Sequence, residues 1–95
     1  MMTAIIQNEK RWDVTGDIGM DNANSLLVSS KRLTLTDEAV IDFAKVGEVD
    51  TSTVSLMLEW QRRAVAENKQ ITFVNLPKNL TSLTALYGVT ALIES

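Results

Sequence analysis

Hydrophobic and polar residues alternate in short blocks along the chain, and the first blocks predict a hairpin followed by a helix. The apolar run 4–6 and the alternating run 12–15 are predicted strands, because a polar stretch separates them. A helix is predicted from about residue 22 to residue 33, with Asp21 or Asn22 as its N-cap. Its buried stripe consists of apolar residues at helical spacing: Ala23, Leu26, Leu27 and Leu33.

The middle of the chain predicts a strand, a long helix and another strand. Residues 39–43 are dense in β-branched and apolar side chains, which is typical of a strand buried on both faces, so we expect it mid-sheet. Residues 44–49 resemble a turn, and the oxygen-bearing side chains at 50–53 favour a helix start. A strand is predicted at 71–74. Strand, helix and strand in this order require a right-handed crossover, which makes the two strands parallel.

Helical spacing places one stripe of the long helix in the core. The predicted stripe contains the following apolar residues: Val54, Met57, Leu58, Ala64 and Val65. Trp60 falls at the edge of this stripe, whereas Leu56 and Arg63 point roughly the other way. Trp60 is therefore either a lid on the core or an anchor for a partner. Leu56 on the outer side favours a partner surface that spans Thr53, Leu56 and Trp60.

The end of the chain predicts one further helix and completes the fold class. Pro77 ends the last strand, and a short amphipathic helix follows that Gly88 closes; its apolar residues are Leu80, Leu83, Leu86 and Tyr87. Residues 91–93 are compatible with either a helix or a strand. The order ββαβαβα predicts an α/β sandwich in which a small mixed sheet packs against helices.

Composition removes most familiar chemistry. The chain has 95 residues, which suits a single domain over 1–95, and it contains neither cysteine nor histidine. These absences exclude disulfides, Cys or His zinc sites and histidine-based catalytic dyads. No glycine-rich phosphate loop is present, and the acidic pairs lie in predicted loops or turns. We therefore expect a protein that is not an enzyme and has no catalytic residues, metal or cofactor.

Charge and hydropathy narrow the choice of partners. The net charge is −3, the wrong sign for a protein that neutralises phosphates, so nucleic acid is not an expected partner. No apolar run approaches the ~20 residues of a spanning helix, and the first residues do not resemble a signal peptide. We expect a cytoplasmic protein whose only link to a membrane runs through another protein.

Three segments resemble STAS domains. The run 40–51 combines a hydrophobic strand, an internal aspartate, a short loop and Asp-Thr at a helix start, as in the STAS signature. Residues 15–18 resemble the Gly-Asp-Leu type turn of the family, and residues 80–89 are similar to its last helix. The resemblance implies the same sandwich fold, and it spans nearly the whole chain.

Within the family, two branches set the functional expectation. The short N-terminus, the Val-Asp-Thr form of the signature and the Leu-Tyr-Gly-Val ending most resemble the MlaB-like branch. That likeness implies a subunit that docks on the ATPase of an Mla phospholipid-trafficking ABC transporter and supports it. The other branch contains anti-sigma factor antagonists, in which a partner kinase phosphorylates the hydroxyl after the signature aspartate. In this sequence that hydroxyl belongs to Thr51, with Ser52 as a competing acceptor because it replaces a usual glycine.

The candidate site is therefore the start of the long helix. It consists of Asp50, Thr51, Ser52 and Thr53, with Leu56, Trp60 and Arg63 as candidates for the surrounding partner surface. Thr51 has two compatible interpretations: a helix N-cap worth about 1 kcal/mol, or an exposed partner contact or phospho-acceptor. In the second case the free amides of the helix start would stabilise a phosphate, and Asp50 would repel it.

Overall fold

The computed structural model describes residues 3–93, which form one four-stranded sheet and four helices. Along the chain the elements are β1 (Ala4–Asn8), β2 (Arg11–Ile18), α1 (Ala23–Ser30), β3 (Glu38–Val49), α2 (Thr51–Ala66), β4 (Gln70–Val74), α3 (Lys78–Leu86) and α4 (Thr90–Ile93). The predicted order ββαβαβα is confirmed, and the tail left open between helix and strand is α4.

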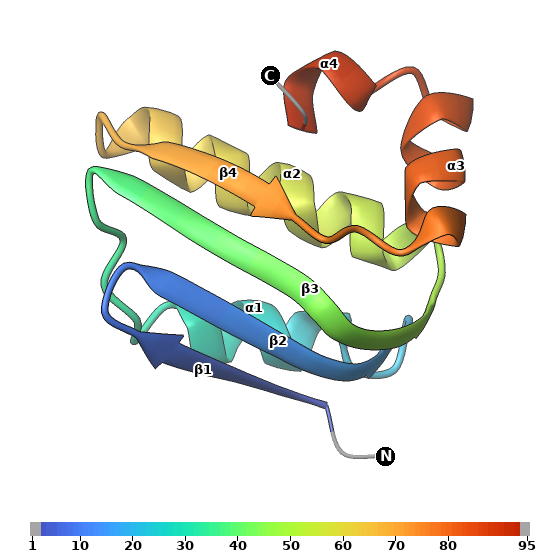
Figure 1. Ribbon diagram of the computed structural model, residues 1–95, viewed down its shortest axis with the longest axis horizontal. Coiled ribbons are helices and arrows are strands. Elements are labelled where there is room, and N and C mark those ends of the chain that lie inside the picture. Colours follow the sequence, from blue (N-terminus) through green and yellow to red (C-terminus); the bar gives the residue numbers. More distant parts are fainter. Residues whose placement is uncertain (1–2, 94–95) are drawn as a thin grey trace.

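The sheet has the order β1-β2-β3-β4, so β3 lies inside the sheet as predicted (Figure 1). β1 and β2 form the predicted antiparallel hairpin, and the turn between them places Glu9 at a φ of 57°. β3 is parallel to both β2 and β4. The sheet is therefore mixed, and β1 and β4 are its two edge strands.

The predicted turn at 44–49 is wrong, because β3 continues through it to Val49. Asp13 of β2 pairs with Asp42, but Thr15 pairs with Lys45, so β3 holds one more residue than β2 over this interval. Such a bulge bends a strand without ending it. The polar residues that suggested a turn are accommodated because β2 supplies the hydrogen-bonding partner along this stretch.

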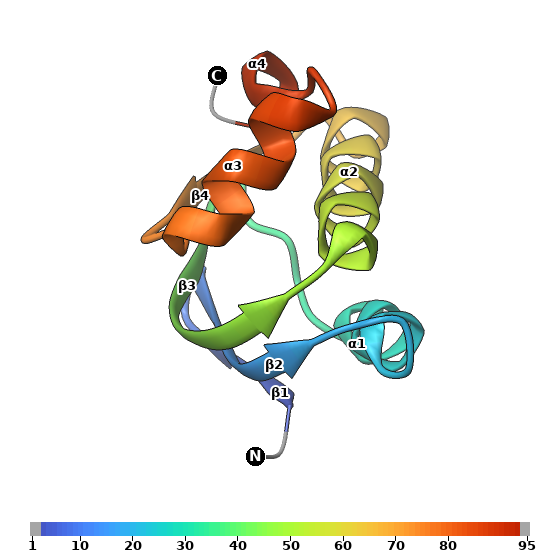
Figure 2. The same cartoon turned by 90° about the vertical axis from the view of Figure 1, so that its right-hand side faces the viewer.

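Helices α1 and α2 cover one face of the sheet, and α3 and α4 lie at the β4 end (Figures 1 and 2). Four aromatic side chains lie in the core between the layers: Trp12, Phe43, Trp60 and Phe73. Their rings meet edge to face, with the centroids of Trp12 and Trp60 5.8 Å apart and those of Phe43 and Phe73 6.0 Å apart. This aromatic cluster ties α2 to three strands of the sheet.

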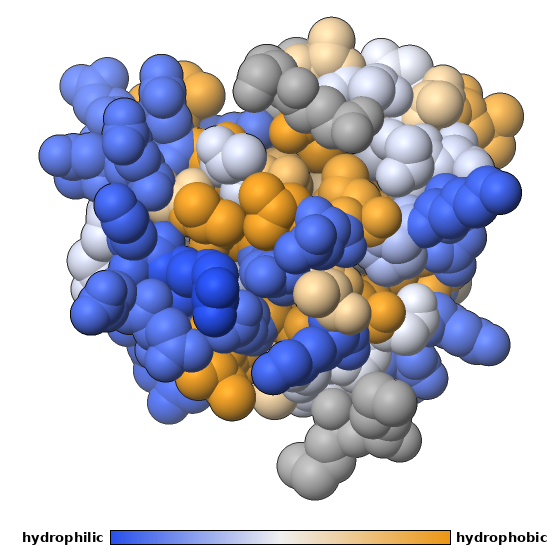
Figure 3. Space-filling view, in the orientation of Figure 1, coloured by the Kyte–Doolittle hydropathy of each residue, from blue (hydrophilic) through white to orange (hydrophobic). Residues whose placement is uncertain are grey.

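The opposite face of the sheet is turned toward the viewer in Figure 3 and mixes polar residues with small apolar patches. Ile6 is 55% exposed on this face, and its cross-strand row continues through Asp13 and Asp42 to Val74.

Within residues 3–93, no helix combines the length and the hydrophobicity that crossing a bilayer requires.

The buried side of α2 is wider than the predicted stripe. Val54, Met57 and Ala64 are buried as predicted, but Val65 is 76% exposed and Leu56 is buried. The prediction assumed a helix covered on one side, whereas α2 contacts α1, α3 and α4 in addition to β4. In the same way α3 buries Leu80 and leaves its predicted apolar positions Leu86 and Tyr87 exposed.

Candidate functional site at the start of helix α2

Two loops lie side by side at one end of the sheet, where the parallel strands β2 and β3 end (Figure 2). One loop leads from β2 into α1, and the other leads from β3 directly into α2. Gly19 allows close contact between them, because a Cβ at this position would lie 3.2 Å from Oδ2 of Asp50. The backbone amide of Met20 donates a hydrogen bond to the same oxygen at 3.2 Å. The start of α2 is thus fixed against the first loop.

Asp50 is the N-cap of α2, so Thr51 is not the cap. Its Oδ1 accepts hydrogen bonds from the Ser52 amide at 2.9 Å and from the Ser52 hydroxyl. Asp50 has extended backbone angles, and its carbonyl accepts a hydrogen bond from the Thr53 amide at 3.0 Å. The carboxylate therefore satisfies one of the unpaired donors of the helix start and lies at the favourable end of the helix dipole.

These hydrogen bonds keep the Asp50 carboxylate ionised. The hydrogen bond from the Ser52 hydroxyl lowers the pKa of Asp50 below its ordinary value, and the backbone amides of Ser52, Met20 and Thr53 act in the same direction. Partial burial opposes them with a smaller net effect. A phosphate added at Thr51 would therefore lie beside a permanent negative charge.

The lowered pKa predicts a stability term that acid removes. Because the folded pKa lies below the unfolded one, the cap stabilises the fold above about pH 4 and loses its effect as pH falls through the folded pKa. At pH 7, Asp50→Ala should lower the free energy of unfolding by about 1 kcal/mol. The difference from wild type should shrink as the pH falls below about 4, in urea titrations at several pH values.

Asp21→Ala is the matched control for this prediction. Asp21 belongs to the neighbouring loop, is exposed and accepts no hydrogen bond from the described residues. Its loss should change stability by less than about 0.5 kcal/mol. A penalty for Asp50→Ala that stays constant from neutral to strongly acidic pH would contradict the charged-cap account.

The other predicted residues at the helix start divide into two groups. Thr51 is exposed and Ser52 is half-buried, so both hydroxyls lie at the surface, with Ser52 engaged by Asp50. Thr53 is buried, and its hydroxyl donates to the carbonyl oxygen of Ile18 at 3.3 Å. The prediction that Thr53 belongs to an exposed partner site is therefore wrong. Thr53 instead connects α2 to the end of β2.

The predicted partner surface farther along α2 is corrected too. Trp60 is 1% exposed, and its Nε1 donates to the Ser30 hydroxyl at 2.9 Å, so it is a core lid and not a surface anchor. Leu56 is 3% exposed because α1 covers the side of α2 that was predicted to face outward. Neither side chain is exposed enough to anchor a partner.

Arg63, the third predicted residue of the partner surface, has a structural role instead. Its guanidinium donates to the carbonyl oxygens of Ser30 at 2.9 Å and Leu33 at 2.7 Å, just beyond the last turn of α1. It also pairs with Glu67 at 2.7 Å and lies over the Trp12 ring, 5.6 Å from its centroid. Arg63 thus adds charged hydrogen bonds to carbonyls at the end of α1, as a cation at a helix C-terminus does.

The accessible surface lies between the first turns of α1 and α2. A groove of about 310 Å³ runs there, which we call the α1–α2 groove; it is lined by Met20, Ala23, Asn24, Leu27, Ser52, Ser55, Leu56 and Glu59. Met20 is 84% exposed, more than any other large hydrophobic residue that the structure describes. Sequence analysis missed Met20, although an apolar residue between Gly19 and Asp21 fits no core stripe and could have been noticed.

The groove offers chemistry that is suited to recognition. The groove presents one flexible apolar side chain, serine hydroxyls and a carboxylate, which suits contact with another polypeptide. Within the described residues, no three acidic side chains come together in a way that could hold a metal ion.

The sequence was also compared with models of known protein families. A family model described as "Mlab, STAS domain" matches residues 1–94. The chain belongs to this STAS domain family. A search of curated proteins found no match.

Two solved structures share the fold of this STAS domain. The anti-sigma factor antagonist SpoIIAA in its unphosphorylated form superimposes with a TM-score of 0.61 at 11% identity, over 90% of this chain and 83% of that one. The structure described as "Crystal Structure Analysis of Mglu" gives a TM-score of 0.60 at 19% identity, over 79% of this chain. This STAS domain spans only 20% of the Mglu chain. At these identities the likeness shows a common fold.

Proposed function

We propose that this STAS domain is a non-enzymatic subunit that binds the cytoplasmic ATPase of an Mla-type ABC transporter, which maintains outer-membrane phospholipid asymmetry. The ATPase docks on the exposed first turn of α2 and on the α1–α2 groove beside it. The domain stabilises the active ATPase and is linked to the inner membrane only through this complex.

The observation that carries the proposal is the match to the MlaB family model over nearly the whole chain. The geometry supports it, because Met20 and Thr51 are both exposed and Asp50 links their loops: Asp50 directly precedes Thr51 and accepts a hydrogen bond from the Met20 amide. A docking surface on a rigid helix start costs little ordering entropy when a partner binds. The groove also combines apolar side chains with the hydroxyls of Ser52 and Ser55, which resembles the apolar centre and polar rim of an interface.

A charge at Thr51 tests the proposal. Thr51→Glu places a second carboxylate beside the ionised Asp50 and within the proposed contact, so we expect ATPase affinity to fall by at least about tenfold, or 1.4 kcal/mol. The measurement is co-purification followed by titration calorimetry with the Mla-type ATPase of the same organism. Thr81→Glu, which adds the same charge at an exposed position of α3, should bind like wild type. Equal binding by both variants would refute the docking site.

A second candidate is supported by the likeness to SpoIIAA, which covers most of both chains. In this alternative the domain is an anti-sigma factor antagonist, and an anti-sigma factor kinase phosphorylates Thr51 or Ser52. The two hydroxyls lie at the N-terminal end of α2, where free backbone amides favour an anion. The carboxylate of Asp50 opposes a second negative charge there.

Phosphorylation in cells separates the two candidates. Mass spectrometry of the protein from its native cells should show Thr51 and Ser52 unmodified if the domain is a transporter subunit. Stoichiometric phosphate on either hydroxyl would favour the signalling function.

A further inference from the structure

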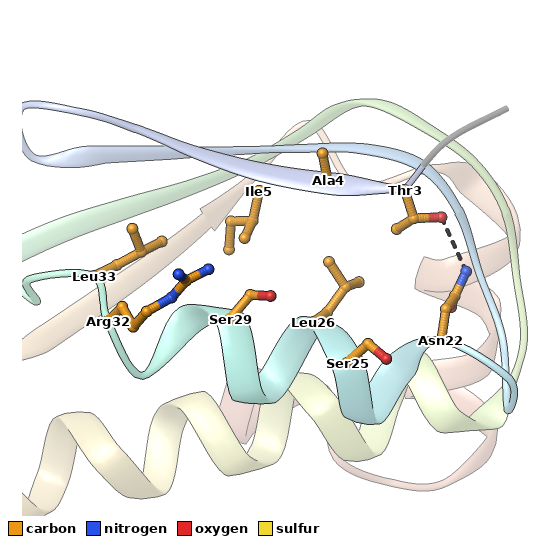
Figure 4. A pocket seen from close by; sticks show the side chains of 9 residues that line it. All are labelled: Thr3, Ala4, Ile5, Asn22, Ser25, Leu26, Ser29, Arg32 and Leu33. Carbon is orange, nitrogen blue, oxygen red and sulfur yellow. Dashed lines mark hydrogen bonds between the residues drawn. The ribbon is translucent and has the colours of Figure 1, made fainter.

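A hollow of about 410 Å³ lies between the edge strand β1 and helix α1, away from the α1–α2 groove (Figure 4). Ile5, Leu26 and Leu33 give it an apolar lining, and Ser25, Ser29 and Arg32 add polar groups from the α1 side. The space exists because α1 covers the sheet without closing against its first strand. It is therefore open along the free edge of β1.

The free edge of β1 can accept another strand. In a hairpin with a two-residue turn, the two residues that flank the turn exchange backbone hydrogen bonds, and so does every second pair after them. In this hairpin the flanking residues are Asn8 and Arg11. The alternate residues Ile5 and Gln7 therefore direct their backbone N–H and C=O groups away from β2. β1 ends the sheet, and residues 4–8 contain no lysine, proline or other charge of the kind that usually protects an edge.

We propose that the β1 edge binds an extended, acidic peptide segment of a partner protein as a fifth strand. Backbone hydrogen bonds to Ile5 and Gln7 hold the segment, and every second side chain of the segment enters the hollow. This surface is separate from the proposed ATPase contact, and the inference does not depend on it.

Arg32 gives the segment its charge. Its side chain lines the hollow, and Figure 4 shows the guanidinium reaching toward β1. The guanidinium of Arg32 makes no ion pair or hydrogen bond with the described residues, whereas both neighbouring arginines on α2, Arg62 and Arg63, are paired with glutamates. An unpaired guanidinium beside an apolar hollow selects a carboxylate that can accept two of its hydrogen bonds.

The spacing of the hollow sets the pattern of the segment. Leu26 and Arg32 are six residues apart on and just beyond α1, which corresponds to about 9 Å along a helix axis. Two residues of a strand cover about 6.6 Å and four cover about 13 Å. The segment would therefore carry an apolar residue that contacts Leu26 and an acidic residue that contacts Arg32. These two residues lie on the same face of the segment, two or four positions apart.

A second copy of this chain fits the hollow less well. The side chains of its own β1 that would face the hollow are Ile5 and Gln7, and both are already used. Ile5 packs against the core, and Gln7 exchanges hydrogen bonds with the backbone of Thr34 at 3.0 and 3.1 Å. A paired second copy would leave the space empty, so a segment of another protein is the occupant that fills it.

The test is selection from a phage-displayed library of random linear peptides on the full chain, followed by NMR. We expect enriched peptides that carry an apolar and an acidic residue two or four positions apart. The best synthetic peptide should shift the amide signals of Ile5 and Gln7. Its affinity should fall at least tenfold for Arg32→Glu and stay unchanged for Lys31→Glu, an exposed neighbour outside this hollow.

Several results would overturn the proposal. These are no enriched peptide, enriched peptides without an acidic residue, equal binding by Arg32→Glu, or shifts confined to the start of α2. Shifts of the Ile5 and Gln7 amides that depend on protein concentration without peptide would assign the edge to a second copy instead. Wild-type affinity for the ATPase is measured separately, so failure here leaves the proposed function standing.

Discussion

Trp60→Ala should lower the free energy of unfolding by about 3–5 kcal/mol, the largest effect expected from any single substitution considered for this STAS domain. The side chain is 1% exposed and packs edge to face against Trp12 and Phe43. The variant also loses the hydrogen bond from Nε1 to the Ser30 hydroxyl. Small domains have only about 5–15 kcal/mol of stability, so much of the total would be lost.

Urea unfolding followed by circular dichroism measures this loss. Val65→Ala is the control on the same helix, because Val65 is 76% exposed, and it should change stability by less than about 0.5 kcal/mol. A Trp60→Ala variant of wild-type stability that had lost ATPase binding would restore the view that Trp60 is a surface anchor.

Met20→Asp should weaken ATPase binding by about thirtyfold, or roughly 2 kcal/mol, without changing the fold. The 84% exposed side chain makes little contact with its own chain, and the substitution keeps the backbone amide that donates to Asp50. In a complex, the aspartate would bring an unpaired charge into a buried apolar contact beside Asp50, which is costly.

Titration calorimetry with the ATPase gives the affinity, and thermal unfolding checks the fold. Leu86→Asp introduces the same charge at a 75% exposed leucine of α3 and should bind normally. If Leu86→Asp abolished binding and Met20→Asp did not, the partner surface would lie at the α3 end of the molecule.

Local patterns were sufficient for the order of elements and for the start of α2, although its cap is Asp50 and not Thr51. Alternation of apolar residues identified the hairpin, and the β-branched run at 39–43 placed β3 inside the sheet. Gly88 was recognised as the end of α3, and its φ of 67° with a bond from the Val89 amide to the Thr84 carbonyl shows the expected helix-ending geometry. Each of these signals depends on residues close together in the sequence.

The errors came from contacts between distant residues. The extension of β3 past Ala44 depends on pairing with β2, which no local pattern contains. The sequence predicts an outward-facing Arg63 on a partner surface, because the end of α1 that Arg63 binds is about 30 residues away. The helical spacing predicts that Leu56 faces outward, because a helical wheel does not show that α1 covers a second side of α2.

The sequence therefore predicted where α2 begins, but not which side chains are exposed around that start. The signature located the start of α2, and Thr51 is exposed there as the partner-contact hypothesis requires. Thr53 and Trp60 belong to the interior, and Met20 replaces them at the surface from a different loop. Only the pairing of β2 with β3 brings that loop next to Asp50.

Hydrogen–deuterium exchange of the domain alone and in complex with the ATPase tests the docking claim most directly. We expect the complex to slow exchange in residues 19–24 and 51–59, the two segments that form the α1–α2 groove. Slowed exchange confined to α3 and α4, with both groove segments unchanged, would contradict the claim.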